Sequence, residues 1–171
     1  MRYLTVVRHA KAAPAQPGGS DFDRGLAKRG REQCKQLRVW ARDLDALGRF
    51  GPTTALVSAA ARTRETFARA FEGTPFVTRS EFSELIYNGH RDVSAESLLA
   101  DLATIDPVSS SLLVIGHNPT VHELMSSLAV ELPPALREYH YPLGAAFVLA
   151  LRDDRPIGLS RYEVVASYVP D

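Results

Sequence analysis

The sequence predicts an α/β protein, a three-layer α/β/α sandwich built on a mainly parallel central sheet. Short runs of apolar and β-branched residues alternate along the chain with longer segments in which apolar residues recur at helical spacing. The runs at residues 3–7 and 111–115 carry no charged side chain, which is typical of strands covered on both faces. Strands that alternate with helices favour parallel pairing, with helices on both sides of the sheet.

The first predicted strand, residues 3–7, leads into a loop at residues 12–25 that is rich in proline, glycine and aspartate. A loop of this length between regular elements is commonly functional. A helix is expected over residues 26–47, where apolar residues recur with helical period until Gly48 and Gly51 end it. This helix returns the chain for a second, parallel strand.

The second strand is predicted at residues 54–57 and is closed by Ser58. A second helix follows over residues 60–71, and Gly73 and Pro75 stop it. Next we expect a short strand at residues 75–78 and an irregular segment at residues 79–92, in which Asn88-Gly89 forms a turn. A serine then caps a helix over residues 94–103.

The clearest buried strand of the sequence is residues 111–115. Asn118 suits the N-cap of the next helix and Pro119 its first residue, which places His117 at a strand-to-helix corner. This helix should end before the two prolines at residues 133–134. Two last strands are expected at or near an edge of the sheet, joined by a polar turn: residues 146–151 and 162–168, with the turn at residues 153–156.

Length and composition indicate one domain spanning residues 1–171. The chain is 45% hydrophobic and 23% charged, as in ordinary globular proteins, and its 20 basic residues balance 20 acidic ones. Without a broad basic surface, we expect no nucleic-acid partner and no membrane partner, so any anion site must be local. No apolar stretch resembles a signal peptide or membrane span, which predicts a cytoplasmic location.

The single cysteine, Cys34, excludes an internal disulfide and a multi-cysteine zinc site. It lies on the apolar stripe of the first predicted helix, so we interpret it as a core residue. The histidines outside the strand ends, His90, His122 and His140, are scattered and are interpreted as surface or packing residues. No metal and no cofactor is expected.

Polar residues follow three of the predicted strands: Arg8-His9, the segment from Ser58 to Arg62, and His117. The carboxyl ends of parallel strands meet at one edge of a sheet, so these side chains should converge. Arginine forks and free backbone N–H groups both match phosphate oxygens, which predicts a phosphate pocket. Of Arg62 and Arg64, we choose Arg62, because it lies in the first helical turn, nearest the sheet edge.

Three short motifs, in this order along the chain, resemble those of the histidine phosphatase superfamily, which has the phosphoglycerate-mutase-like fold. The first resembles an Arg-His-Gly signature, with Ala10 in place of glycine. Together the motifs span nearly the whole chain. They are Arg8-His9-Ala10, then Ser58, Arg62 and Thr66, then Gly116-His117-Asn118-Pro119.

The form of the motifs is most similar to that of the small SixA-type branch, the phosphohistidine phosphatases. The features that carry this likeness are the short chain, Lys11 after the first motif, and Asp23-Arg24 with Gly30 further on. The resemblance implies that neutral His9 attacks phosphorus and forms a phosphohistidine, which water then hydrolyses. It further implies that the equatorial oxygens are stabilised by Arg8, Arg62 and His117.

Other residues are expected to contact the substrate, which would be a phosphorylated protein or a small phosphorylated molecule. Ser58 and Asn118 are candidates within the motifs. Lys11 and Arg24, with Arg29 and Arg31, either line the entrance and attract an acidic phosphoprotein or are simply exposed cations on a solvated surface.

The presence or absence of a general acid distinguishes the possible classes of substrate. Ester cleavage needs a proton for the leaving alkoxide, and Glu84 is the better candidate of Glu81 and Glu84, although a solvated loop glutamate explains it too. An N-phosphorylated imidazole can be protonated on its own ring, so lack of an acid favours protein phosphohistidine. The alternatives are a small-molecule phosphomonoesterase that uses Glu84, and a non-catalytic phosphate or phosphopeptide-binding module.

Overall fold

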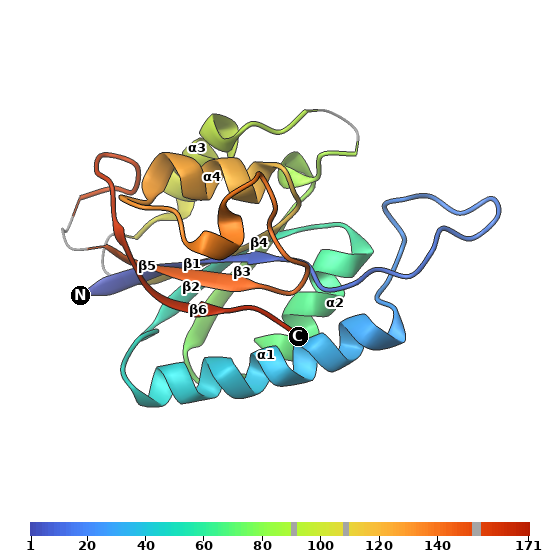
Figure 1. Ribbon diagram of the computed structural model, residues 1–171, viewed down its shortest axis with the longest axis horizontal. Helices are drawn as coiled ribbons and strands as arrows, with labels where there is room; N and C mark the ends of the chain where they lie inside the picture. The colour runs from blue at the N-terminus through green and yellow to red at the C-terminus, as the bar shows by residue number, and fades with distance from the viewer. Residues whose placement is uncertain (90–91, 108–109, 152–154) are drawn as a thin grey trace.

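The computed structural model describes residues 1–89, 92–107, 110–151 and 155–171 (Figure 1). A six-stranded sheet in the order β3-β2-β4-β1-β5-β6 forms its centre. The first four strands of that order are parallel, whereas β5 is antiparallel to β1 and β6 to β5. The strands are β1 (Arg2–Arg8), β2 (Thr53–Ser58), β3 (Val77–Ser83), β4 (Ser111–Gly116), β5 (Ala146–Leu151) and β6 (Glu163–Tyr168).

Helices cover both faces of this sheet, which confirms the predicted α/β/α sandwich with a mainly parallel sheet. Figure 1 shows α3 and α4 on one side of the strands and α1 and α2 on the other. The last two strands lie next to the edge and at the edge, as expected. The helices are α1 (Lys28–Ala46), α2 (Ala61–Ala70), α3 (Ala95–Ile105) and α4 (Thr120–Leu128), with short 3-10 helices η1 (Glu84–Ile86) and η2 (Pro134–Leu136).

Successive residues of β1 point to opposite faces of the sheet, as strand geometry requires. Leu4 and Val6 belong to the core beneath α3 and α4, whereas Tyr3 and Val7 belong to the core beneath α1 and α2. Cys34 is fully buried in this second core, as the sequence predicts. Burial on both faces explains why the sequence of β1 lacks the alternation of apolar and polar residues typical of half-exposed strands.

The third strand differs from the prediction. We expected a strand at residues 75–78 followed by an irregular segment, but β3 runs from Val77 to Ser83. It lies at an edge of the sheet and pairs only with β2. None of its residues is fully buried, so β3 contains polar residues that resemble a loop in sequence. Only its backbone pairing with β2 identifies it as a strand.

The predicted cap of α4 is wrong. The N-cap residue is Pro119, with φ −84° and ψ −9°, and α4 begins at Thr120 without a side-chain cap. Asn118 precedes a cis peptide bond, and its carbonyl accepts a bond from the Asn88 side chain at 3.4 Å. A tertiary contact with another loop, rather than local capping, therefore accompanies the backbone at this corner.

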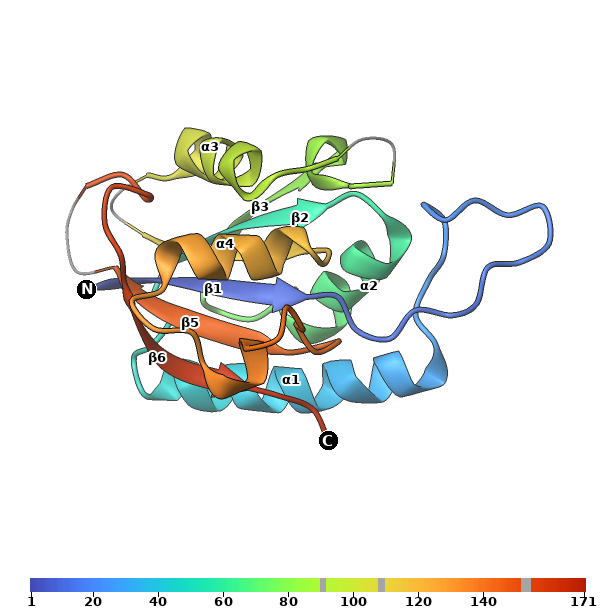
Figure 2. The ribbon, with the colours of Figure 1, turned by 45° about the horizontal axis from the view of Figure 1, so that its top comes forward.

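The loop between β1 and α1 extends beyond the carboxyl end of the sheet (Figure 2). Its two arms are held together at the base, where Ala13 N–H donates to the Gly25 carbonyl at 2.8 Å. At Gly30, a Cβ atom would lie 2.2 Å from the Lys11 carbonyl oxygen, so only glycine lets α1 pack this closely. The close packing fixes the backbone that follows His9.

The predicted turn at residues 153–156 falls mainly on residues outside the described part of the chain.

Helix α1 begins without a side-chain cap. Its N-cap residue is Ala27, whose extended backbone (φ −71°, ψ 167°) is the geometry that a capping serine adopts. We expect Ala27→Ser to raise the free energy of unfolding by about 1 kcal/mol, because the serine oxygen can accept a free N–H of the first turn. Urea unfolding measures this gain. The control Ala68→Ser, on an exposed face within α2, should give no gain, and equal effects of both changes would contradict the explanation.

Candidate active site

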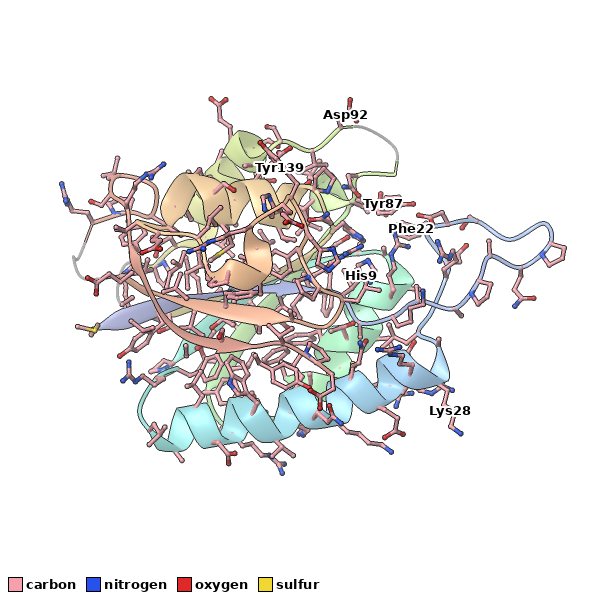
Figure 3. The ribbon with its side chains drawn as sticks, in the orientation of Figure 1. His9, Phe22, Lys28, Tyr87, Asp92 and Tyr139 are labelled. Atoms are coloured by element: carbon pink, nitrogen blue, oxygen red, sulfur yellow. The ribbon has the colours of Figure 1, made fainter. Side chains whose placement is uncertain are left out.

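A polar cavity of about 290 Å³ opens at the carboxyl ends of β1 and β4, beside the first turn of α2. It lies where the sequence predicts that strand ends meet. Figure 3 shows His9 at this end of the molecule, where the loop after β1 leaves the sheet. The cavity is lined by Arg8, His9, Lys11, Ala12, Arg24, Arg62, Asn88, His117, Asn118 and Leu143.

His9 presents an uncharged imidazole to this cavity. Its Nδ1 lies 2.8 Å from the carbonyl oxygen of Ala10. A carbonyl can only accept, so Nδ1 carries the proton and donates, and Nε2 keeps its lone pair. Burial lowers the pKa of His9 to about 3, and the charges of Arg62 and Arg8 act in the same direction, against the raising effect of the Ala10 bond. The ring is therefore neutral at physiological pH, with a free lone pair on Nε2.

His117 faces the same cavity and turns its Nδ1 edge, rather than Nε2, toward the ligand space. Its Nε2 lies 2.7 Å from Ser58 Oγ, and that oxygen accepts the Ala60 N–H at 3.5 Å, so the serine hydroxyl is free to donate to Nε2. With the hydroxyl as donor, the ring proton lies on Nδ1, which is buried and has no partner among the described residues. Burial, followed by the neighbouring His9, lowers the pKa of His117 to about 2.

The two imidazoles thus offer complementary groups to one ligand. Their ring centroids are 5.2 Å apart and the planes are inclined at 56°. A lone pair on His9 Nε2 can attack, while the N–H at His117 Nδ1 can donate to an oxygen of the group attacked. An unpartnered buried donor of this kind indicates a ligand that accepts a hydrogen bond.

Of the three arginines that line the cavity, Arg62 is buried and Arg8 is partly buried. Arg62 is 7% exposed and lies in the first turn of α2. Arg8 donates from Nη1 to the Tyr141 carbonyl at 2.6 Å, and its Nε is buried without a partner among the described residues. Burial and the nearby Arg62 both lower the pKa of Arg8, although the guanidinium stays charged. Two close cations with free donors favour an anion in the cavity.

Arg64, the alternative to Arg62, points elsewhere. Its guanidinium carbon lies 4.8 Å from the ring centroid of Phe82, on the outer side of β3. The two residues diverge because positions two apart on a helix lie about 200° apart around its axis. The structure therefore places Arg62, and not Arg64, in the cavity.

Asp21 was not singled out from the sequence, yet it connects the loop after β1 to the cavity. Its carboxylate accepts bonds from Tyr87 Oη (2.6 Å), Arg24 Nη1 (2.8 Å) and Arg62 Nη2 (3.1 Å). The main-chain oxygen of Asp21 accepts a second bond from Arg62 at 2.9 Å. The hydrogen bond from Tyr87 is the main cause that holds the pKa of Asp21 well below its usual range. The bonds and charges of Arg24 and Arg62 act in the same direction. The carboxylate is thus ionised and positions two of the arginines.

Tyr87 was also missed. Its ring packs edge-on against His117 at 5.5 Å and against Phe22 at 5.0 Å, and Figure 3 shows Phe22 beside Tyr87. The ring also lies 5.7 Å from the Arg62 guanidinium carbon. The only local signal was the Asp21-x-x-Arg24 spacing in the loop, since Tyr87 is far away in the sequence.

Other residues named from the sequence lie in three kinds of place. Lys11, Arg24 and Asn118 line the cavity, together with Asn88, which was not predicted. Ser58 is fully buried and does not line it; the hydroxyl contacts His117 instead of facing the ligand space. Glu84 is exposed in η1 and is also absent from the cavity wall.

The remaining histidines and the cysteine lie apart from His9. His122 is buried in α4 and its Nε2 lies 2.6 Å from the Leu136 carbonyl, His140 is exposed, and His90 lies outside the described residues. Burial raises the pKa of the Cys34 thiol to about 12, which makes it a poor nucleophile. Within the described residues, no group of three or more histidine, cysteine or acidic side chains could hold a metal ion.

The depressed pKa values of His9 and His117 predict a loss of stability in acid. Both imidazoles bind protons more readily in the unfolded chain, where the usual pKa is 6.5, than in the folded protein. Their contribution is complete above pH 6.5 and is lost as the pH falls toward 3. As the pH falls within that window, each imidazole should lower the free energy of unfolding by up to about 1.4 kcal/mol per pH unit.

Urea unfolding between about pH 6.5 and pH 4 measures this slope. His9→Asn should reduce the slope of the free energy of unfolding against pH by the contribution of one proton. His140→Asn, at an exposed position, should leave the slope unchanged. Equal slopes for wild type and His9→Asn would contradict the assignment of a neutral, buried imidazole.

The chain shares its mainly parallel sheet and the helices on both faces with solved structures of the phosphoglycerate-mutase-like fold. Searches with the sequence against protein-family models and curated proteins gave no match. Comparison with solved structures, in contrast, gave many matches. Other phosphatases, including phosphoserine phosphatase from Entamoeba histolytica and alpha-ribazole phosphatase from Shigella flexneri, match along nearly the whole chain with lower TM-scores than the SixA structures.

Among the similar solved structures are three that carry the name SixA. The protein from Agrobacterium tumefaciens, provisionally named phosphohistidine phosphatase SixA, is 26% identical (TM-score 0.76, covering 99% of both chains). One from Nakamurella multipartitia, provisionally given the same name, is 24% identical (TM-score 0.77, covering 99% of this chain and 96% of that one). The protein histidine phosphatase SixA complexed with tungstate is 21% identical (TM-score 0.73, covering 98% and 96%).

The chain is therefore structurally similar to proteins named SixA phosphohistidine phosphatase and to other phosphatases. Along the described residues, no helix combines the length and apolar character needed to cross a membrane.

Proposed function

We propose that residues 1–171 form one histidine phosphatase domain that hydrolyses protein phosphohistidine through a covalent intermediate on His9. His9 Nε2 attacks phosphorus in line, the P–N bond to the substrate imidazole breaks, and that imidazole leaves protonated on its own ring. Water then attacks the phosphohistidine, the bond to His9 breaks, inorganic phosphate leaves, and neutral His9 is restored. No cofactor and no metal takes part in this proposal.

Charge stabilisation in both steps falls to groups that line the cavity. The transferred phosphoryl group carries its charge on three equatorial oxygens, so positioned donors supply most of the catalysis. Arg8 and Arg62 offer guanidinium N–H groups, and His117 offers the N–H at Nδ1. Lys11, Arg24 and Asn118 are available to contact the rest of the substrate. Ser58 would act through His117 by holding its tautomer.

The observation that carries the choice of substrate is the composition of the cavity wall. Among its described residues there are cations, two imidazoles and amides, but no carboxylate. Asp21, the nearest carboxylate in the hydrogen-bond network, is held ionised by Tyr87 and the arginines, so it is a poor proton donor. Without a general acid, a leaving alkoxide would depart slowly, whereas an imidazole can take its proton on the ring.

The alternative of a small-molecule phosphomonoesterase requires Glu84 as the acid, and the exposed position of Glu84 outside the cavity wall disfavours it. A non-catalytic binding module is disfavoured by the pairing of a free lone pair on His9 with a donor on His117. We expect a phosphorylated protein as partner, no nucleic acid or membrane, and a cytoplasmic location.

The test of the proposed function is phosphate release. A phosphohistidine-containing protein, free phosphohistidine and a panel of phosphate esters are offered to the protein under the same conditions. We expect the value of kcat/KM to be highest for phosphohistidine substrates. Faster hydrolysis of alkyl phosphate esters than of phosphohistidine would contradict the proposal.

Glu84→Gln separates the two substrate classes further. We expect the variant to keep nearly full activity on phosphohistidine, because the leaving imidazole needs no acid from the protein. If Glu84 were a general acid, the substitution would remove about 10²–10⁴ in rate on esters with poor leaving groups. Glu81→Gln is the matched control, on the neighbouring strand β3 and paired with Arg79. A large loss on phosphohistidine caused by Glu84→Gln alone would overturn the choice.

A further inference from the structure

A second cavity of about 300 Å³ adjoins the one that contains His9. The two cavities share three wall residues, Arg8, Lys11 and Leu143, so they lie side by side. The proposed function uses the first cavity and assigns nothing to the second. The wall of the second cavity consists of Arg8, Lys11, Arg29, Gln33, His140, Pro142, Leu143 and Pro170.

The floor of this second cavity is fixed by one side chain. Gln33 of α1 is only 8% exposed, and its Oε1 accepts the Lys11 N–H at 2.9 Å. Its Nε2 donates to the Leu143 carbonyl at 3.3 Å. Gln33 therefore joins the segment after His9 to the segment before β5. Gly30 keeps α1 close against Lys11, so the backbone beneath the cavity is well defined.

Above this floor the cavity carries positive charge. Lys11 and Arg29 are exposed, and no aspartate or glutamate side chain is among the described residues of the wall. The ammonium group of Lys11 and the ring of His140 have no hydrogen-bond or ion-pair partner within the described part of the chain. Arg29 makes one bond, from Nη2 to the main-chain oxygen of Asp171 at 3.1 Å, which leaves further donors on its fork.

We propose that this second cavity is a subsite for a carboxylate that the substrate carries near its phosphorylated group. The inference rests on the proposed function and makes it more specific: the preferred substrate is a phosphohistidine segment with an aspartate or glutamate a few residues away. Arg29, Lys11 and His140 donate to that carboxylate while the phosphoryl group lies between His9 and His117.

The spacing along the chain suits this arrangement. Lys11 is two residues from His9, so their Cα atoms are at most about 7 Å apart. A carboxylate two to four residues from the phosphohistidine can span such a distance in extended or helical backbone. The overall charge of the protein is zero, so this preference would come from the local cations and not from a general attraction for acidic partners.

The experiment compares two phosphohistidine peptides of equal length. One has aspartate or glutamate two to four residues from the phosphohistidine, and the other has asparagine or glutamine there. We expect wild type to show a kcat/KM about fivefold higher on the acidic peptide, an advantage that shrinks in high salt, as for partly exposed charge pairs. The Arg29→Gln variant should lower the ratio to about one, mainly through KM on the acidic peptide.

Lys28→Gln is the matched control, because it removes one positive charge from the adjacent position of α1. Lys28 does not line either cavity, and Figure 3 shows it pointing away from His9. This variant should keep the preference of wild type. Equal rates of wild type on the two peptides, or the same preference in wild type and Arg29→Gln, would overturn the subsite.

A separate arm distinguishes failure of the subsite from failure of the proposed function. Phosphoramidate, which has no second anionic group, reports the chemistry at His9 alone. If neither phosphoramidate nor phosphohistidine is hydrolysed, the proposed function fails. Two aryl phosphates, with and without a carboxylate substituent, then test the subsite for a small-molecule substrate with the same variants. If Arg29→Gln loses the preference for the aryl phosphate that carries a carboxylate, the subsite is supported for small-molecule substrates. An unchanged preference in this variant overturns the subsite.

Discussion

Replacement of His9 by asparagine is expected to abolish phosphatase activity, with a loss of at least about 10³-fold in kcat. Asparagine has no lone pair of imidazole basicity with which to attack phosphorus. The change also removes one neutral imidazole from the wall but leaves Arg8, Arg62 and His117 in place, so phosphate or tungstate should still bind. Activity assays with anion binding by calorimetry distinguish the loss of chemistry from the loss of the pocket.

The covalent intermediate can be detected directly. Brief exposure of wild type to a labelled phosphodonor, followed by denaturation, should leave an acid-labile and base-stable phosphate on the peptide that contains His9. The His9→Asn variant should carry none. Cys34→Ala is the control and should label as wild type does, because Cys34 is buried in the core beneath α1. Label on Ser58 or Cys34 would refute the mechanism.

Substitution of Arg62 by lysine is expected to lower kcat/KM by about 10²-fold or more, although the charge is kept. Arg62 is buried, and its fork can contact two phosphate oxygens, which a single ammonium group cannot do. The same fork contacts Asp21 through both its main-chain and side-chain oxygens. Lysine would therefore also loosen the loop after β1, and KM should rise as kcat falls.

Arg64→Lys is the matched control on the same helix turn. Arg64 lies over Phe82, away from the cavity, so we expect kcat/KM to stay within about twofold of wild type. Thermal unfolding of both variants checks that each is folded. A larger loss for Arg64→Lys than for Arg62→Lys would contradict the position of the two side chains on α2.

The hydrophobic pattern was sufficient to predict the central part of the fold. Burial on both faces makes β1 and β4 almost entirely apolar, and the single apolar face of α1 repeats at helical spacing. Such patterns are local, so they can be read along the chain. The rule that parallel strands present their carboxyl ends at one edge was sufficient to bring Arg8, His9, Arg62 and His117 together.

Edges and corners were less predictable. The edge strand β3 has no fully buried residue, so its polar residues looked like a loop. Asn118 has the side chain of a helix cap, but its carbonyl contacts Asn88 and α4 begins two residues later. In both places, contacts with residues distant in the sequence outweigh the local preference.

The sequence by itself therefore determined the central strands, the long helices and which motif residues meet at the strand ends. Only the tertiary structure decided the chemical state of those residues. The bonds to Ala10 and Ser58 place the ring proton on Nδ1 in both His9 and His117, so that His9 offers a lone pair and His117 an N–H group. Asp21 meets Arg62 and Tyr87 across 41 and 66 positions of the chain. Protonation and hydrogen bonding depend on burial and on partners brought together by folding, and neither leaves a periodic pattern in the sequence.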